Sequence, residues 1–235
     1  MSNFLDGARR WLRRLADLAI PQDCFVCGAG SGSAFLCGAC RNELPAQPPA
    51  CPICAVPSAA GAVCGRCLRA PPAFDATHAA LAYGFPLDRI VQALKYRHRL
   101  AIAGFFAGLL EPLGPPQGAS LILPMPLHVR RLRERGFNQA VEIARPLARA
   151  WRLPLELRAV ERAMHTAPQV SLPWSARSVN MRGAFRCDGS FAGRTVVVVD
   201  DVMTTGATLD ELARTLKRHG AARVENLVVA RTPPA

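Results

Sequence analysis

The sequence predicts an α/β fold in which helices flank a parallel sheet and a small cysteine-rich module precedes it. Three observations carry this prediction. Residues 195–199 are β-branched without polar alternation, which is typical of a strand buried on both faces of a parallel sheet. A helix with one apolar face, residues 208–219, follows closely. Eight cysteines stand in four Cys-x-x-Cys pairs between residues 24 and 67. A length of 235 residues with 50% hydrophobic content suffices for one α/β domain with an appendage.

The chain is strongly basic, with a formal net charge of +12 and 29 basic residues, all arginine except Lys95 and Lys217. Arginine suits phosphate recognition, so the charge favours polyanion binding, although a codon bias would produce the same composition. Arginines interrupt the only apolar stretch near the start, and no uncharged run is long enough to span a membrane. We therefore expect a cytoplasmic protein without a signal peptide or transmembrane segment.

Residues 1–22 form the first predicted unit. Residues 3–20 place apolar side chains at helical spacing with arginines opposite, which predicts an amphipathic helix. Such a helix packs on its own domain with a solvated basic face, or it lies on a membrane or a nucleic acid.

Residues 23–70 form the second predicted unit, a double zinc ribbon. Two Cys-x-x-Cys turns supply the four thiolates of one tetrahedral zinc site, so four turns predict two structural Zn²⁺ ions. Sequential pairing of the turns is the simplest arrangement, and a cross-braced one stays open. The segment has too few large apolar residues to bury a core, so zinc would supply its folding energy. It either binds nucleic acid or mediates structural contacts. The predicted ligands are Cys24, Cys27, Cys37, Cys40, Cys51, Cys54, Cys64 and Cys67.

Pro71 and Pro72 precede the third predicted unit, residues 73–235. Its patterns predict a strand or strand pair over 74–85, helices over 87–99, 101–113 and 139–151, and strands over 120–126, 155–164, 181–186 and 223–230. The first helix ends in Lys95, Tyr96 and Arg97, which either cover a site from above or form a solvated helix end. Cys187 lies apart from the other cysteines, as a buried or incidental thiol.

Two carboxylates and a small-residue turn follow the strand over 195–199. The strand is expected to end at Asp200 and Asp201, and Thr208 with Glu211 is expected to form a capping box for the next helix. Backbone N–H groups at a helix start bind phosphate, and paired carboxylates accept hydrogen bonds from vicinal hydroxyls or hold Mg²⁺. Phosphate and diol together indicate a ribose 5-phosphate.

Residues 196–208, VVVVDDVMTTGAT, resemble the phosphoribosyl pyrophosphate (PRPP) loop of type I phosphoribosyltransferases. The resemblance implies PRPP with Mg²⁺ as ligands and a type I phosphoribosyltransferase-like sheet. Asp200 and Asp201 would bind the ribose hydroxyls. The 5-phosphate would lie on the turn formed by Thr204, Thr205, Gly206, Ala207 and Thr208.

The same resemblance implies two further contacts with PRPP. A pyrophosphate loop would follow the strand over 120–126, with Arg135 beside it as a phosphate contact or as part of a solvated charged face. The long polar segment over 165–180 would be a flexible lid. The expected loop and lid residues are Pro124, Met125, Pro126, Leu127, Gln169, Arg177 and Asn180.

The order of motifs is similar to that of the ComF/GntX family of phosphoribosyltransferase-like proteins. The paired cysteine motifs, residues 94–97 (LKYR), residues 133–139 (RERGFNQ) and the PRPP loop stand in that order. Family members are associated with natural competence, which implies single-stranded DNA and other DNA-uptake proteins as partners. Purine-salvage phosphoribosyltransferases carry a general-base aspartate where this chain has Thr204. Two classes therefore remain open: an enzyme that transfers phosphoribose with release of pyrophosphate, or a non-catalytic PRPP sensor or DNA-binding protein.

Overall fold

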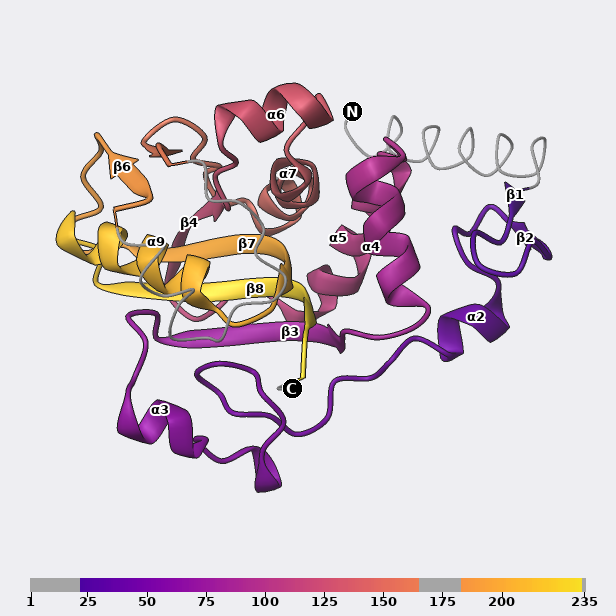
Figure 1. Ribbon diagram of the computed structural model, residues 1–235, viewed down its shortest axis with the longest axis horizontal. Helices are drawn as coiled ribbons and strands as arrows, with labels where there is room; N and C mark the ends of the chain where they lie inside the picture. The colour runs from indigo at the N-terminus through magenta and orange to yellow at the C-terminus, as the bar shows by residue number, and fades with distance from the viewer. Residues whose placement is uncertain (1–21, 165–182, 234–235) are drawn as a thin grey trace, which may run out of the picture.

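The computed structural model describes residues 22–164 and 183–233 and has a four-stranded parallel sheet at its centre (Figure 1). The strand order is β3-β8-β7-β4. This sheet confirms the predicted α/β class. Within the described residues, no helix is long and apolar enough to cross a membrane. The four strands are β3 (Ala76–Ala82), β4 (Ala119–Pro124), β7 (Thr195–Met203) and β8 (Arg223–Arg231).

Helices cover both faces of the sheet, and this explains the unbroken apolar run in β7. Val196 and Val198 belong to one core together with α9 (Ala207–Arg218). Val197 and Val199 belong to a second core, on the other face of the sheet. Because successive side chains of a strand point to opposite faces, a strand covered on both sides has no polar position. The helices that build the second core are α4 (Leu87–Tyr96), α5 (Ala101–Leu110) and α7 (Gln139–Trp151).

The predicted helix over 139–151 is confirmed, and the helices over 87–99 and 101–113 are shorter than expected. α5 is followed by a 3₁₀ turn, Glu111–Leu113. The arginine run forms an unexpected short helix, α6 (Val129–Arg135), in which His128 Nδ1 accepts from Arg130 N. Helical spacing of apolar residues does not mark α6, because it lies on the surface and buries no residue completely. Gly136 ends it in the left-handed region, with φ of 74°.

A short antiparallel hairpin, β5 (Val160–Arg162) with β6 (Phe185–Cys187), takes the place of the two longer strands predicted around the lid segment. The predicted lid with Gln169, Arg177 and Asn180 lies outside the described residues, and so does the predicted helix over 3–20.

The structure corrects two predictions around the acid pair. β7 does not end before Asp200 but continues to Met203, because β8 supplies parallel partners as far as Arg231. The Thr208 and Glu211 capping box is also wrong. The N-cap of α9 is Gly206, with φ of 83°, and the Glu211 carboxylate instead accepts from Gly183 N at 2.8 Å. The turn is therefore closed by a left-handed glycine, which has no side chain to cap the N–H groups of α9.

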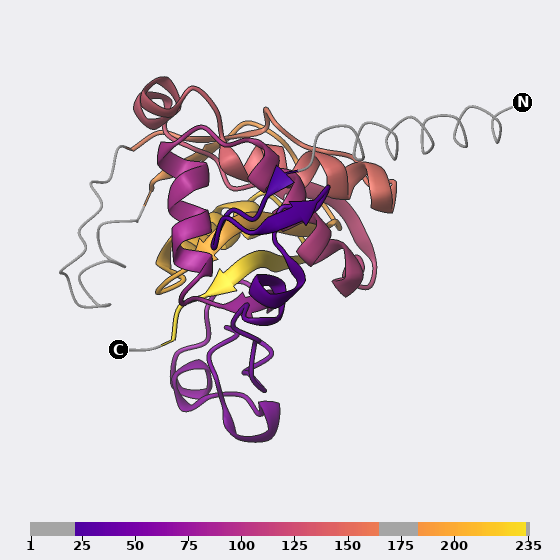
Figure 2. The same ribbon diagram turned by 90° about the vertical axis from the view of Figure 1, so that its right-hand side faces the viewer.

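The two ribbons pack at different places on the sheet domain (Figures 1 and 2). The first contains β1 (Gln22–Asp23), β2 (Gly30–Gly32) and α2 (Gly38–Asn42), and it contacts α5 through Phe35 and Phe105, whose ring centroids are 4.9 Å apart. The second contains the 3₁₀ turn Ala59–Gly61 and α3 (Gly65–Arg69), and it lies beside β3, where Thr77 N donates to Pro52 O at 3.1 Å. Their cysteines belong to the cores on opposite faces of the sheet.

Candidate metal centres and phosphate-binding site

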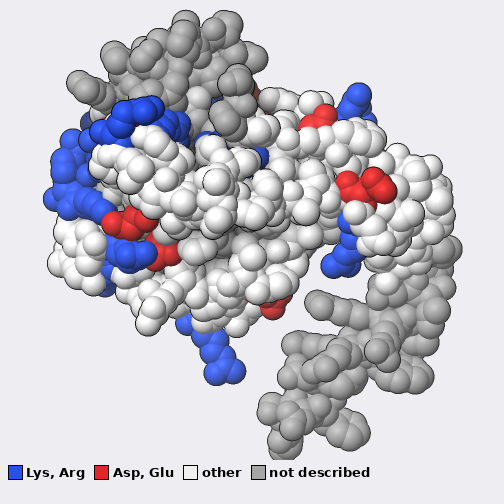
Figure 3. All heavy atoms as spheres, turned by 90° about the horizontal axis from the view of Figure 1, so that it is seen from below, with Lys and Arg blue, Asp and Glu red and all other residues white. Residues whose placement is uncertain are grey.

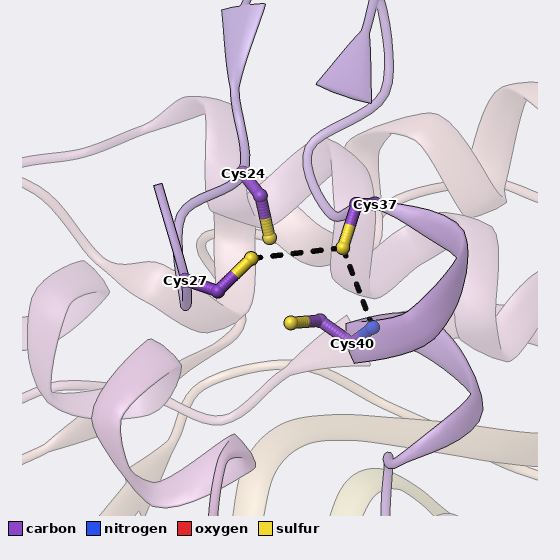
Figure 4. A group of neighbouring side chains, drawn as sticks. All are labelled: Cys24, Cys27, Cys37 and Cys40. Atoms are coloured by element: carbon purple, nitrogen blue, oxygen red, sulfur yellow. Dashed lines mark hydrogen bonds between the residues drawn. The ribbon is translucent and has the colours of Figure 1, made fainter. Parts of the chain in front are cut away.

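Each ribbon gathers its four sulfurs into one cluster. The Sγ atoms of Cys24, Cys27, Cys37 and Cys40 all lie within 4.8 Å of one another, and so do those of Cys51, Cys54, Cys64 and Cys67 (Figure 4 shows the first cluster). A tetrahedral site with Zn–S bonds of about 2.3 Å separates its sulfurs by about 3.8 Å. The Cys27–Cys37 and Cys54–Cys64 sulfur distances are 3.7 and 3.6 Å. Both donor sets therefore fit Zn²⁺, and the pairing is sequential.

One cysteine of each cluster favours the thiolate, the form that binds zinc. Hydrogen bonds with neighbouring thiols and burial raise the pKa of Cys40 in the first cluster, and burial raises the pKa of Cys54 and Cys67 in the second. Burial raises the pKa of Cys24, but backbone N–H groups at Cys27, Cys37 and Val26 outweigh it and lower that pKa to about 6. The equivalent residue of the second cluster is Cys51. Burial is again outweighed by backbone N–H groups, and the pKa of Cys51 falls to about 7. The remaining cysteine, Cys187, is buried, which is one of the two alternatives given by the sequence. Its Sγ lies 3.4 Å from Gly189 O.

The acid pair stands near the carboxyl end of β7, and Lys95 of α4 reaches it. Lys95 Nζ lies 2.7 Å from Asp201 Oδ2, and the Asp201 residue is only 2% exposed. Burial lowers the pKa of Lys95, but Asp201 and Asp200 outweigh burial and raise it above its usual value. Of the two interpretations of this helix end, the structure therefore favours a helix that covers the site, since Lys95 is held by the acid pair.

Asp200 is in a different electrostatic environment. Burial and the neighbouring Asp201 carboxylate raise the pKa of Asp200 to about 8, although Lys95 opposes the shift. The Asp200 carboxylate also accepts from Asp201 N at 2.9 Å. Two adjacent carboxylates in a partly buried site repel each other, so the site gains from a cation or from hydroxyl donors beside Asp200.

Arginines surround this acid pair. Burial lowers the pKa of Arg162 in β5, and the nearby Asp200 carboxylate opposes that shift while Arg131 adds to it. Arg135 at the end of α6 lies over the Tyr96 ring, 5.7 Å from its centroid, and donates to Gln139 Oε1 at 2.6 Å. A cluster of arginines beside two carboxylates is suited to a ligand that carries both hydroxyls and phosphates.

The turn after β7 presents free donors. Among the described residues, the backbone N–H groups of Thr204, Thr205 and Gly206 have no protein acceptor. Ala207 N donates to Thr205 Oγ1 at 3.3 Å. The turn stands at the N-terminus of α9, where the helix dipole adds positive potential, so it forms a cradle for an anion.

The expected pyrophosphate loop lies at the same end of the sheet. Pro124 is in register with Val199, and Met125 N donates to Val199 O at 2.8 Å, which places Met125 level with Asp200. The side chains of Pro124 and Met125 are buried, and those of Pro126 and Leu127 are half-buried. Asn138 Nδ2 holds the loop by donating to Met125 O at 3.0 Å. The loop therefore offers backbone groups rather than side chains to a ligand.

Arg162 is the site residue that the sequence did not predict. It stands in β5, immediately before the predicted lid, and no motif marks it. Its approach to Asp200 depends on the β5-β6 hairpin, which is formed by segments on either side of residues 165–182. In the sequence, Arg162 is marked only as a basic residue that precedes the polar segment 165–180.

Comparison with known proteins finds matches for both parts of the chain. A family model described as a double zinc ribbon domain matches residues 15–68, and one described as a phosphoribosyl transferase domain matches residues 135–234. The chain is 37% identical over 172 residues to "DNA utilization protein YhgH" of Escherichia coli (strain K12), covering 70% of this chain and 76% of that protein. It is 31% identical over 209 residues to "Competence protein F" of Haemophilus influenzae, covering 83% of this chain and 90% of that protein.

Among solved structures, a hypoxanthine phosphoribosyl transferase of Trypanosoma cruzi matches 63% of this chain and 76% of its own at 17% identity, with a TM-score of 0.32. The relatives' identity and coverage, the two family models, the paired cysteine clusters and the parallel sheet agree with one another. The chain belongs to the ComF/GntX family, in which a double zinc ribbon is joined to a phosphoribosyltransferase domain.

Proposed function

We propose that the chain binds PRPP with Mg²⁺ at the acid pair and the following turn, residues 200–208. The observation that carries this proposal is the placement of a partly buried carboxylate pair and three backbone N–H groups, which have no acceptor among the described residues, within one strand-turn-helix segment. The ribose hydroxyls donate to Asp200 and Asp201, and the turn binds the 5-phosphate.

Arginine side chains on the neighbouring elements would bind the second anionic group of PRPP, its pyrophosphate. Arg135, Arg162 and the backbone after β4 gather at the same end of the sheet as Asp200. Mg²⁺ fits an oxygen-rich site of this kind, where carboxylates and phosphates are its usual ligands, and it would neutralise charge on the pyrophosphate.

The experiment that tests the proposal is calorimetric titration of the zinc-loaded chain with Mg·PRPP, followed by ribose 5-phosphate and pyrophosphate separately. Binding of Mg·PRPP with competition by both fragments supports the assignment. Absence of heat at millimolar Mg·PRPP, together with no competition by either fragment, rejects it.

Transfer of the ribose is the further step of the proposal. Departure of pyrophosphate leaves positive charge on the ribosyl carbon, which the acid pair stabilises electrostatically, and an acceptor nucleophile then completes an N-ribosyl product. The general-base aspartate of purine-salvage enzymes is replaced by the exposed Thr204, so a purine base is disfavoured as acceptor. A screen for PRPP-dependent pyrophosphate release with bases, amines and single-stranded DNA separates a transferase from a PRPP sensor.

A groove on α4 favours a second function, the binding of single-stranded nucleic acid. A cavity of about 440 Å³ is lined by Phe25, Phe85 and Tyr96 with Arg89 and Arg97. Phe85 and Tyr96 are 71% and 67% exposed. Exposed aromatic rings beside arginines allow bases to stack while phosphates are neutralised. The relatives named for competence and DNA utilization support a role of this chain in DNA uptake.

A further inference from the structure

The second ribbon is joined to the phosphate turn by a buried arginine. Arg231 is the last residue of β8 and is only 3% exposed. Its Nε donates to Cys54 O at 2.8 Å, and its Nη1 donates to Met203 O at 3.1 Å and also to Thr204 O. One guanidinium therefore contacts both a zinc-ligand residue and the turn that follows the acid pair.

Two more contacts join the same parts. Arg66 of α3, which lies between the ligands Cys64 and Cys67, places Nη1 at 3.4 Å from Thr205 O. The chain that leaves the ribbon is held to the first turn of α9, where Ala73 N donates to Asp210 Oδ1 at 2.6 Å. Three of the four cysteines of this cluster also share a hydrophobic core with Met203 and Ala207.

These contacts orient the N–H groups of the turn. In a trans peptide the C=O and the N–H of the same unit point in opposite directions. Arg231 and Arg66 draw the carbonyls of Met203, Thr204 and Thr205 towards the ribbon. The N–H groups of Thr204, Thr205 and Gly206 therefore face away from the ribbon, where no described protein group accepts from them. Arg231 and Arg66 therefore determine the direction in which the N–H groups of the turn point.

Charge explains why Arg231 stays buried although no carboxylate of residues 22–164 or 183–233 pairs with it. The guanidinium lies beside the second cluster, since its Nε donates to the backbone carbonyl of the ligand Cys54. Four thiolates around one Zn²⁺ leave a net negative charge, which a buried guanidinium balances. Loss of zinc, or of the thiolates, would change the position and the solvation of Arg231.

We propose that the second zinc cluster, Cys51, Cys54, Cys64 and Cys67, acts through Arg231 to position the phosphate turn, so that zinc in this cluster and the anion at the turn favour each other's binding. Arg231 is a positioning residue, since it holds carbonyls and lies behind the turn. The ligand part of this inference rests on the proposed function, whereas the ordering of the turn by zinc does not.

The chain supplies its own control, because the first cluster has the same donors and contacts α5 instead of the turn. Cys64→Ser and Cys27→Ser each remove one of the less buried ligands, from the second and the first cluster respectively. We expect each variant to lose one zinc. Cys64→Ser should weaken Mg·PRPP binding by about tenfold or more, the usual effect of losing charged hydrogen bonds, while Cys27→Ser should stay within about twofold of wild type. Equal affinities of the two variants would overturn the proposal.

Arg231→Met tests the connection itself, with Arg223→Met, at the exposed start of the same strand, as its control. Arg231→Met should retain two zinc ions yet lose the zinc-dependent order of the turn. We expect amide exchange without ligand to be about tenfold faster at Ala207, Asp210 and Thr232, whose N–H groups donate to Thr205 Oγ1, Gly206 O and Met203 O. Arg231→Lys, which keeps the charge, should recover part of the effect and serves if Arg231→Met does not fold. Unchanged exchange in a folded variant rejects the connection.

Coupling must be reciprocal, so the ligand should protect the metal. We expect Mg·PRPP to slow release of one of the two zinc ions to a chromogenic chelator by about tenfold in wild type and not in Arg231→Met. If wild type binds no Mg·PRPP, the proposed function fails, and the amide exchange of Cys64→Ser and Arg231→Met without ligand still decides whether the ribbon orders the turn. If wild type binds Mg·PRPP without any protection of zinc, the reciprocal coupling is wrong while the proposed function stands.

Discussion

At the scale of single residues, the raised pKa of Asp200 makes the stability of the chain depend on pH. Its pKa is about 8 in the folded chain, against 3.8 without the fold. The folded state therefore holds a proton that the unfolded state releases, and the stability gained from it is present at low pH and lost as pH rises towards 8. Asp200→Asn should remove this dependence. At pH 8 its free energy of unfolding should exceed that of wild type by roughly 1–3 kcal/mol.

At pH 9, where Asp200 is ionised, the same substitution should weaken Mg·PRPP binding by about 1–3 kcal/mol, because it removes an anionic acceptor for the ribose hydroxyls. Thermal unfolding between pH 5 and pH 9 and calorimetry measure the two effects, with the exposed Asp188→Asn as the control. A variant that is no more stable than wild type at pH 8 contradicts the raised pKa. Undiminished binding contradicts the assigned role.

Gly206 is fixed by its backbone and its surroundings. Its φ is 83°, and an added Cβ would lie 2.6 Å from Met203 Cε. Gly206→Val should distort the turn and weaken Mg·PRPP binding by about 2 kcal/mol or more, with zinc content unchanged. Gly108→Val, on an exposed helical position with open space around it, is the matched control. Equal affinities for Mg·PRPP in the two variants would show that the turn does not bind the phosphate.

At the scale of elements, the two ribbons should each hold one zinc. Elemental analysis of the reduced chain should give two Zn²⁺ per molecule, and alkylation of the native protein should modify none of the eight cluster thiols, because zinc-bound thiolates are protected. Chelation should then unfold the ribbons, since their folding energy comes from the metal. Eight thiols that react freely in native protein contradict this prediction.

The elements that the sequence predicted well are those with strong local signals. β7 and α7 follow from an unbroken β-branched run and from apolar periodicity, and the four cysteine pairs predicted both clusters with their sequential pairing. The end of β7 could not be predicted, because it depends on hydrogen bonds from β8. The cap of α9 was missed because Gly206 in the left-handed region replaces a side-chain cap, and Glu211 found a partner in Gly183.

The remaining site residues depend on long-range contacts. Arg162 is far from the acid pair in sequence, and Arg231 is far from the second ribbon. Only the folded sheet brings Arg162 near Asp200 and Arg231 into contact with Cys54. The sequence allows Lys95 to cover the site, but its ion pair with Asp201 is a tertiary contact that no local pattern predicts. Sequence motifs thus predicted the family and both cysteine clusters, while the groups that position the acid pair and the turn required the fold.

At the scale of the whole molecule, positive charge is unevenly spread. On the face drawn in Figure 3, lysine and arginine side chains gather towards one end, and most of that face is uncharged. Binding of single-stranded DNA should weaken linearly with log[salt], with a slope of about −0.7 per neutralised phosphate. Fluorescence anisotropy at several salt concentrations measures this slope, and binding that is undetectable at low salt or insensitive to salt rejects the nucleic-acid proposal.

The α4 groove is tested separately. Phe85→Ala should cost about 1–3 kcal/mol of DNA affinity if a base stacks there, whereas Leu113→Ala, another exposed apolar residue outside the groove, should cost nothing measurable. Equal effects of the two variants would place the DNA elsewhere on the molecule.

The strand order has a consequence for how the chain assembles during synthesis. β3 emerges early from the ribosome, yet within the described sheet its only partner strand is β8, which emerges after all the others. Until then β3 and the second ribbon have no sheet on which to dock, and Arg231 has not been made. The first ribbon can dock on α5 before the second ribbon has a sheet to dock on, so the phosphate turn should reach its final form only after β8 has been made.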